Sequence, residues 1–223
     1  MNQTKFFLLL SLIIVSGLFS SCKKEDSNKG NLIISARMSR SGINPKQTTP
    51  MLVFNTGYVV VREVVFDGEM TNGSSISITE EKITTIDLVT GVANPPFLMD
   101  IPAGTYTDIN LGIEIQDETS RPSVIAEGVY TNASGVATPK RFEFNSGEVF
   151  EANSVGTVTL SAATPATAKI TFDPHEWFSV LTRAQLDNAT RTNGVIIISE
   201  TRNSALFTLV ADRLDDATQA YFE

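Results

Sequence analysis

The chain has 223 residues, a formal net charge of −8, one cysteine and one histidine. Because 25 acidic side chains outnumber 17 basic ones and the basic ones are dispersed, nucleic acid and anionic lipid headgroups are poor partners. A single histidine excludes zinc sites built from histidine pairs and haem held by two histidines. The length suits one large domain with its own core, and the many Thr, Ser, Val and Ile residues favour β structure.

The N-terminal segment has the pattern of a lipoprotein signal peptide. Lys5 precedes the apolar run Phe6–Phe19. That run is too short for a hydrocarbon core of about 30 Å, which disfavours a transmembrane anchor, but it suits the apolar core of a signal peptide. Ser20 and Ser21 are small enough to let a peptidase reach the backbone beside Cys22, the only cysteine. The alternative is an ordinary secreted protein with a spare cysteine.

We therefore predict a signal peptide over residues 1–21, an acyl group on Cys22 and a flexible tether over residues 22–30. Lipidation of Cys22 leaves no thiol for a disulfide, a metal site or a nucleophile, and two or more acyl chains hold a protein stably on a membrane. The charged run Lys23–Asp26 resembles the export tag of surface lipoproteins in Bacteroidota, although a merely solvated tether has the same composition. The expected location is the outer membrane, with the domain surface-exposed or facing the periplasm.

Short strands separated by turn residues fill residues 31–172. The clearest is Thr105–Gln116, where apolar and polar residues alternate, so that one face meets a core and the other meets water. Turn residues stand at Gly68, Asn72-Gly73, Pro102–Gly104 and Asn132–Gly135. The other expected strands are Asn31–Ser39, Tyr58–Phe66, Ser75–Ile78, Lys82–Val89, Phe97–Ile101, Ser123–Thr131, Thr138–Asn145, Glu148–Glu151, Val155–Leu160 and Ala168–Phe172.

The pattern changes from strands to helices at Asp173. This residue can accept hydrogen bonds from the first amides of a helix that begins at Pro174, and Glu176 can reach back to complete a capping box. Thr182 with Gln185 predicts the start of a second short helix.

Two further elements are predicted near the end of the chain. Val195–Ile198 is fully apolar, which predicts a central strand, and Arg202–Ala220 has an apolar stripe at helical spacing, which predicts the best helix. The predicted fold class is mainly β. We expect a single antiparallel β-sandwich, Ig-like or transthyretin-like, over residues 31–223, with a helical C-terminal part (173–223) whose last helix packs on the sandwich.

No arrangement of catalytic residues accompanies these elements. A serine triad would have to use His175, but the positive end of a helix disfavours its protonated form and no G-x-S-x-G elbow is present. Acidic neighbours such as Glu80 and Glu81 usually point apart, whereas a glycosidase needs two carboxylates that converge. Asp117 and Glu118 are weak metal candidates, and an ordinary loop explains them as well. We therefore predict a non-enzyme without a cofactor.

Aromatic side chains can form a stacking platform for a sugar, and Trp177 is one candidate. Its place on the apolar stripe of a short capped helix favours a core role instead. Tyr58, Tyr106 and Tyr130 are likewise expected inside the sandwich.

Three parts of the chain resemble a known group of proteins. The sequence P-A-G-T-Y-T at Pro102–Thr107 follows Ile86-Asp87-Leu88, and Trp177-Phe178 and Ile198–Phe207 come later. Together they resemble a broad group of bacterial lipoproteins of unknown function that is common in Bacteroidota. Pilus-like adhesin domains and transthyretin-like modules are similar in the first motif. The resemblance implies a β-sandwich and an outer-membrane location, and it carries over no catalytic residues.

The function predicted first is a lipid-anchored, non-catalytic module that contacts another macromolecule or a glycan. Loops 40–57, 90–96 and 117–123 are the expected binding loops, because Pro and Gly hold irregular backbone there. The alternative is a periplasm-facing lipoprotein that binds a small ligand or a metal, which requires a real cavity. A hydrolase is the third hypothesis, and it requires an acidic pair about 5–10 Å apart in a cleft.

Overall fold

The computed structural model describes residues 29–39, 51–163, 165–214 and 218–222. The predicted signal peptide, Cys22 and loop residues 40–50 lie outside the described residues. Lys29 and Gly30, which were assigned to the tether, belong to the first strand, so the tether prediction is wrong at its last two positions. In the described parts of the chain, no helix is long and apolar enough to cross a membrane.

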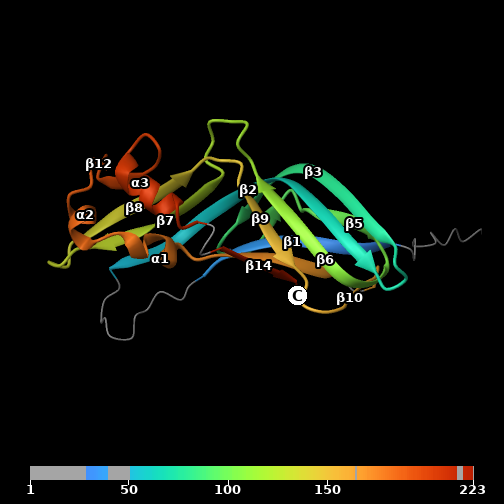
Figure 1. Cartoon of the computed structure of the whole chain (residues 1–223). Helices are drawn as coiled ribbons and strands as arrows, with labels where there is room; N and C mark the ends of the chain where they lie inside the picture. Colours follow the sequence, from blue (N-terminus) through green and yellow to red (C-terminus); the bar gives the residue numbers. More distant parts are fainter. Residues whose placement is uncertain (1–28, 40–50, 164, 215–217, 223) are drawn as a thin grey trace, which may run out of the picture.

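The described residues are mainly β with short helices, as predicted (Figure 1). The strands are β1 (Lys29–Met38), β2 (Leu52–Met70), β3 (Ser75–Asp87), β4 (Ala93–Asn94), β5 (Leu98–Pro102), β6 (Gly104–Ile115), β7 (Val124–Thr131), β8 (Ala137–Phe144), β9 (Val149–Asn153), β10 (Val158–Leu160), β11 (Ala166–Phe172), β12 (Arg191–Thr192), β13 (Val195–Ile198) and β14 (Thr218–Phe222). The helices are α1 (Pro174–Trp177), the 3-10 helix η1 (Phe178–Val180), α2 (Arg183–Asp187) and α3 (Ser204–Ala211).

The strands form two mixed sheets. The small sheet has the order β14-β11-β1-β5, and the large one has the order β10-β6-β2-β7-β8-β13-β12, with β3, β4 and β9 attached beside this path. β1 pairs with β11 in parallel, and so does β13 with β8. The prediction of a purely antiparallel arrangement is therefore wrong. Both parallel pairs join strands far apart in sequence, as parallel pairing requires a long connection.

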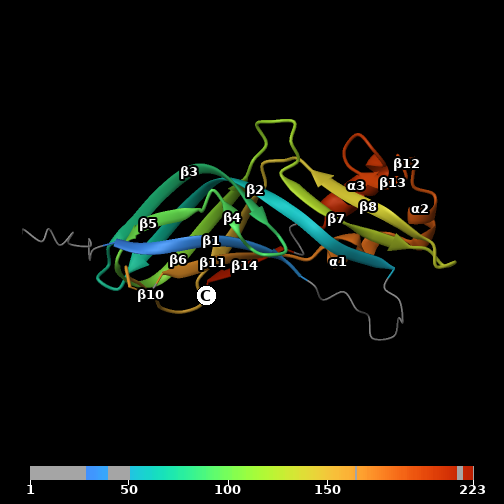
Figure 2. The ribbon, with the colours of Figure 1, turned by 180° about the vertical axis from the view of Figure 1, so that it is seen from behind.

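One buried cluster joins the two sheets. Leu32 and Ile170 of the small sheet and Ile109 of the large sheet are fully buried in it. Phe150 of β9 meets Phe172 of β11 edge to face, with 5.4 Å between the ring centroids. The helices gather at the β7–β8 end of the large sheet, while β1, β5 and β11 lie at the β6–β10 end (Figures 1 and 2).

The chain passes from the small sheet to the large one at Pro102–Gly104. This segment is a corner between β5 and β6, which lie in different sheets. The Tyr106 hydroxyl donates to the Pro102 carbonyl oxygen at 2.7 Å, and its fully buried ring packs on Phe66. Such a bond from a tyrosine to upstream backbone fixes a corner in β-sandwiches. Gly104 does not have positive φ; a Cβ there would collide with the Met70 side chain.

Two predicted strand boundaries are wrong. β2 runs without a break for 19 residues, so Gly57 and Gly68 lie inside a strand. A Cβ at Gly68 would come within 2.8 Å of the rings of Tyr106 and Phe66, so close packing explains this glycine. β3 continues through the residues that were expected to separate two strands. The Asn72-Gly73 turn between β2 and β3 is confirmed, with Gly73 at φ 83°.

The helix predicted over Arg202–Ala220 is wrong in its second half. Helix α3 ends at Ala211, and Thr218–Phe222 forms β14, which pairs with β11 at the edge of the small sheet. Pairing with an available sheet edge overrides the helical spacing of the apolar residues. The C-terminal part therefore mixes short helices with β12, β13 and β14. The strand Val195–Ile198 is confirmed, and it has a neighbour on each side.

Candidate binding groove

A groove of about 780 Å³ crosses the large sheet where β3, β2, β7 and β8 lie side by side. Tyr58 of β2 stands in register with Asp87 of β3 on one side and with Ile125 of β7 on the other. Alternation along β2 places Tyr58 on the face opposite the core residue Val59. Ile125 is only 3% exposed but is not part of the core cluster, so it forms an apolar floor beside Tyr58.

One end of the groove is lined by charged side chains from β7 and β8. Arg141 Nη1 lies 3.3 Å from Glu127 Oε1, and Arg141 Nε lies 2.7 Å from Glu143 Oε1. The Thr56 hydroxyl donates to the other Glu127 oxygen at 3.2 Å. These contacts hold a guanidinium donor and a carboxylate acceptor side by side, which is an arrangement that can bind a hydroxyl group of a ligand.

The turn after β3 forms one wall. Asp87 accepts from the Thr90 amide at 2.7 Å, and this hydrogen bond lowers the pKa of Asp87 below its ordinary value. Gly91 takes a left-handed φ of 75°. The Ser35 hydroxyl donates to the Gly91 carbonyl, and Arg37 donates to the Thr90 carbonyl, both at 3.1 Å. The wall is therefore tied to β1 of the small sheet as well as to its own strand.

Loop 117–123 reaches the groove through Arg121. Its Nη2 donates to the Thr85 hydroxyl at 3.2 Å, and its guanidinium carbon lies 4.8 Å from the centroid of the Tyr58 ring. The structure thus brings two of the predicted binding loops together, since Thr90, Val92 and Asn94 of loop 90–96 line the same groove. Of the predicted loop 40–57, the described residues that line the groove, Thr56 and Gly57, belong to β2.

The tyrosines and the tryptophan divide between core and groove. Trp177, Tyr106 and Tyr130 are fully buried, as expected. The expectation that Tyr58 lies inside the sandwich is wrong, because this ring is half-buried on the outer face. The signal that could have found this is the alternation along β2, which places Tyr58 on the face opposite the core residues Val59 and Val61.

The weak metal candidates Asp117 and Glu118 are not among the residues that line the groove. Glu118 forms an ion pair with Arg62, and Arg62 Nη1 also lies 3.2 Å from Glu114 Oε1. These carboxylates raise the pKa of Arg62, Glu118 most strongly. Among the residues that the structure describes, no three His, Cys, Asp or Glu side chains are arranged to hold a metal ion.

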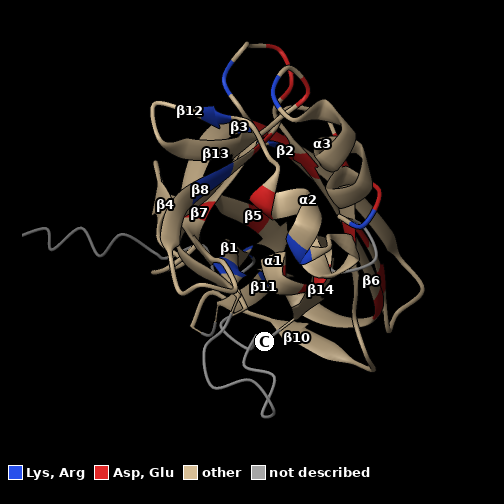
Figure 3. Cartoon of the chain, turned by 90° about the vertical axis from the view of Figure 1, so that its left-hand side faces the viewer, with Lys and Arg blue, Asp and Glu red and all other residues tan. Residues whose placement is uncertain are grey.

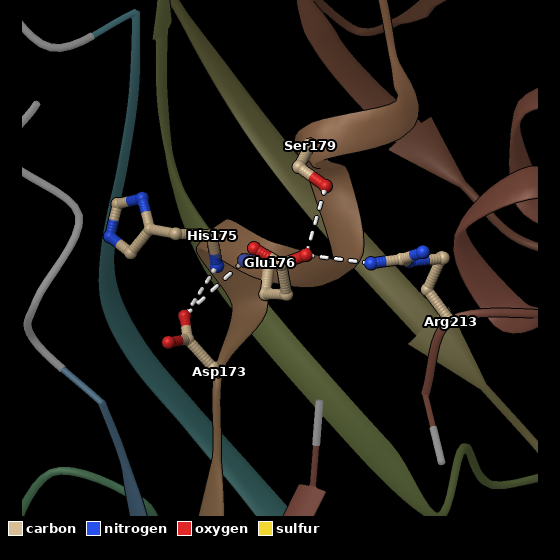
Figure 4. Close-up of polar contacts among 5 residues, drawn as sticks. All are labelled: Asp173, His175, Glu176, Ser179 and Arg213. Atoms are coloured by element: carbon tan, nitrogen blue, oxygen red, sulfur yellow. Dashed lines mark hydrogen bonds and ion pairs between the residues drawn. The ribbon is translucent and has the colours of Figure 1, made fainter. Parts of the chain in front are cut away.

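His175 lies in the first turn of α1 (Figure 4) and is not among the residues that line the groove. The Asp173 carboxylate accepts from the amides of His175 and Glu176 at 3.1 and 3.3 Å, which confirms the predicted cap. Glu176 does not complete the box; its carboxylate instead accepts from Arg213 at 2.6 Å and from the Ser179 hydroxyl. The His175 ring points away from this cluster, as Figure 4 shows. At Thr182 the capping box with Gln185 is complete.

Sequence reasoning missed Lys140. This residue of β8 is 3% exposed, and its Nζ makes no hydrogen bond within the described structure. Burial lowers the pKa of Lys140 well below its ordinary value. The pKa of His175 is lowered too, mainly by burial, with Asp173 opposing the shift and Lys140 adding to it. The sequence signal for this burial is the period of two along β8, which places Lys140 on the same face as the buried Phe142.

The groove carries both signs of charge, although the chain as a whole is acidic. Asp87 and Glu127 stand against Arg141 in its lining, and Arg121 lies over Tyr58. Figure 3 shows basic residues on β8 and β12 and acidic residues along β2 and β6. This balance suits a ligand that carries many hydroxyl groups and little net charge. The chain matches no protein-family model, no curated protein and no solved structure.

Proposed function

We propose that this chain is a lipid-anchored, non-catalytic binding module of the outer membrane, and that its groove holds a neutral glycan. The observation that carries the proposal is the pairing of the Tyr58–Ile125 floor with polar groups at both ends of the groove. Sugar rings present C–H faces, which pack on aromatic and aliphatic side chains, and hydroxyl rims, which hydrogen-bond to carboxylates and guanidinium groups.

The anchor in this proposal is an acyl group on Cys22, which follows a signal peptide over residues 1–21. It rests on the apolar run and the small residues before Cys22. A module held at the cell surface by lipid needs affinity for a partner rather than turnover, and a rigid groove supplies affinity. The ties from Ser35 and Arg37 to the groove wall support such rigidity.

We also infer that the two sheets form a β-sandwich of the immunoglobulin-like or transthyretin-like kind. The shared core and the Tyr106–Pro102 corner support this assignment. The two parallel strand pairs depart from the antiparallel pattern of those folds.

The test is a binding screen of the chain against a panel of neutral and charged polysaccharides, followed by titration calorimetry with each ligand found. We expect a neutral glycan to bind, and we expect Tyr58→Ala and Arg141→Gln each to weaken that binding tenfold or more. Tyr221→Ala is the matched control, because Tyr221 is an exposed tyrosine on the other sheet, and its affinity should equal that of the unaltered chain. A glycan affinity that Tyr58→Ala leaves unchanged would contradict the proposal.

The volume of the groove also suits a small polar ligand, which is the periplasm-facing alternative. Monosaccharides and amino acids in the same screen separate the two functions. If a single small molecule binds as tightly as any polymer, the alternative is correct.

A further inference from the structure

The outward face of the small sheet carries exposed apolar side chains. Ile33, Leu98 and Tyr221 are 37%, 47% and 37% exposed. Ile33 stands opposite Leu98 across β1 and β5, and Tyr221 stands opposite Lys169 across β14 and β11. Strand alternation places all four side chains on the face away from the core. A sheet face with several exposed apolar side chains is a candidate contact surface.

Basic side chains lie among these apolar residues on the same face. Lys29 and Arg37 of β1 and Lys169 of β11 lie on the same outward face. Lys169 Nζ lies 5.6 Å from the centroid of the Tyr221 ring, and Lys29 Nζ lies 2.9 Å from Asp100. The face thus carries three basic residues against one acidic residue, Asp100, in a chain of net charge −8.

We propose that this face docks on the phosphate-bearing phospholipid headgroups of the membrane that holds the chain, an inference that rests on the lipid anchor proposed above. Tyrosine and aliphatic side chains enter the headgroup region, and basic side chains bind lipid phosphates. A surface that carries apolar and basic side chains together fits both parts of a membrane surface, and two weak contributions reinforce an acyl anchor.

The position of the anchor also favours the membrane as the occupant. Residues 22–29 span at most about 25 Å when fully extended, so an acylated Cys22 keeps the start of β1 near the lipid surface. β1 carries Lys29, Ile33 and Arg37 of the proposed face. A short tether gives the lipid surface a high effective concentration near the face, so even a weak contact is sufficient for docking.

The proposal departs from the expectation, drawn from the dispersed charges of the sequence, that anionic headgroups are poor partners. Lys169 lies far from Lys29 and Arg37 in the sequence, and only the parallel pairing of β1 with β11 brings the three onto one face. Each basic residue near an anionic membrane contributes about fivefold to affinity.

The experiment places a polarity-sensitive fluorophore on a new cysteine at the centre of the face, Thr167→Cys. The acylated chain is reconstituted in vesicles of phosphatidylethanolamine with about 30% phosphatidylglycerol, and Ser77→Cys on the exposed side of β3 is the control. We expect a blue shift and quenching by brominated lipid at position 167 and neither at position 77. The double change Lys29→Gln with Lys169→Gln should weaken docking about 25-fold, and high salt should have the same effect.

A second chain separates the face from the anchor. The chain without residues 1–21 and with Cys22→Ser and Thr167→Cys has neither the apolar run Phe6–Phe19 nor an acylation site, so its binding to concentrated phosphatidylglycerol vesicles reports the face alone. We expect this chain to bind the vesicles weakly, and we expect the double change Lys29→Gln with Lys169→Gln to abolish that binding. This result supports the proposal whether or not mass spectrometry finds lipid on Cys22 in the unaltered chain. Equal fluorescence signals at positions 167 and 77 would overturn the proposal. A blue shift at position 167 that grows with protein concentration in the absence of vesicles would also overturn it, because it means that a second copy of the chain covers the face.

Discussion

The Nζ atom of Lys140 lies 2.8 Å from the centroid of the Phe54 ring and makes no hydrogen bond to the described residues. Phe178 of η1 lies on another side, with its centroid 5.0 Å from the same nitrogen. The contact with two aromatic rings offsets only part of the cost of burying an ammonium group. The amine is therefore a local instability beneath the short helical segment α1–η1.

Replacing Lys140 by methionine should stabilise the fold. Methionine keeps the length of the side chain and removes the unpaired polar group, so we expect the free energy of unfolding to rise by about 1–3 kcal/mol. For a domain of this size that corresponds to about 2–4 °C in melting temperature per kcal/mol. Thermal unfolding followed by circular dichroism measures the change. Lys29→Met at an exposed position is the control and should shift stability little. A lower melting temperature for Lys140→Met would contradict this account of the amine.

Stability should also rise with pH between neutrality and about pH 10. The pKa of Lys140 is lower in the folded chain than in the unfolded chain, so in this range the unfolded state binds more protons. Raising the pH therefore removes the free-energy cost of burying the charged amine of Lys140. The difference in the free energy of unfolding between Lys140→Met and the unaltered chain should shrink. Urea unfolding of both chains at several pH values measures the difference. A constant difference across the range would show that the folded chain holds Lys140 in its charged form.

Above about pH 10 the trend should reverse because of Tyr130. Burial and the Asp187 carboxylate, which accepts from the Tyr130 hydroxyl at 2.7 Å, raise the pKa of Tyr130 to about 12. An unfolded tyrosine loses its proton near pH 10, so the contribution of Tyr130 is present below pH 10 and is lost as the pH approaches 12. Burial also raises the pKa of Tyr106, so absorbance of the phenolate band should show late transitions from both buried tyrosines, and Tyr130→Phe should remove one of them. If the tyrosines titrate together near pH 10, the structure at Tyr130 is wrong.

Tyr106→Phe should loosen the corner between the two sheets. The change removes the hydrogen bond to the Pro102 carbonyl and leaves the ring in place, so we expect a loss of about 1–2 kcal/mol in the free energy of unfolding. Tyr221→Phe alters an exposed ring and is the matched control. Urea unfolding of both variants provides the measurement. Equal stability of the two variants would mean that the hydroxyl of Tyr106 does not hold the corner.

The sequence predicts those elements whose pattern of apolar and polar residues fits only one type of secondary structure. Thr105–Gln116 alternates over its whole length and forms β6 almost as predicted, because one buried face requires a period of two. The apolar residues between Arg202 and Ala220 fit a helix, yet part of this segment pairs with β11. Nothing local distinguishes the two outcomes, since the open edge of β11 exists only after the sheet has formed.

The residues of the groove show the same limit of prediction from local sequence. Loops 90–96 and 117–123 were predicted as binding loops from their Pro and Gly content, and both reach the groove. Its floor was not predicted, because Tyr58 and Ile125 come together through the register of β2 with β7. Residues gathered by register leave no mark in the local sequence.

The central claim is that the groove binds a neutral glycan. Its most direct test is a nuclear magnetic resonance titration of the isotopically labelled chain with the tightest neutral glycan from the screen. The account predicts that the amide signals of Tyr58, Ile125 and Glu127 move with a common affinity, and that those of the small sheet stay in place. Shifts confined to another surface, such as the cleft between α2 and α3 beside Asn188 and Ser204, would contradict it.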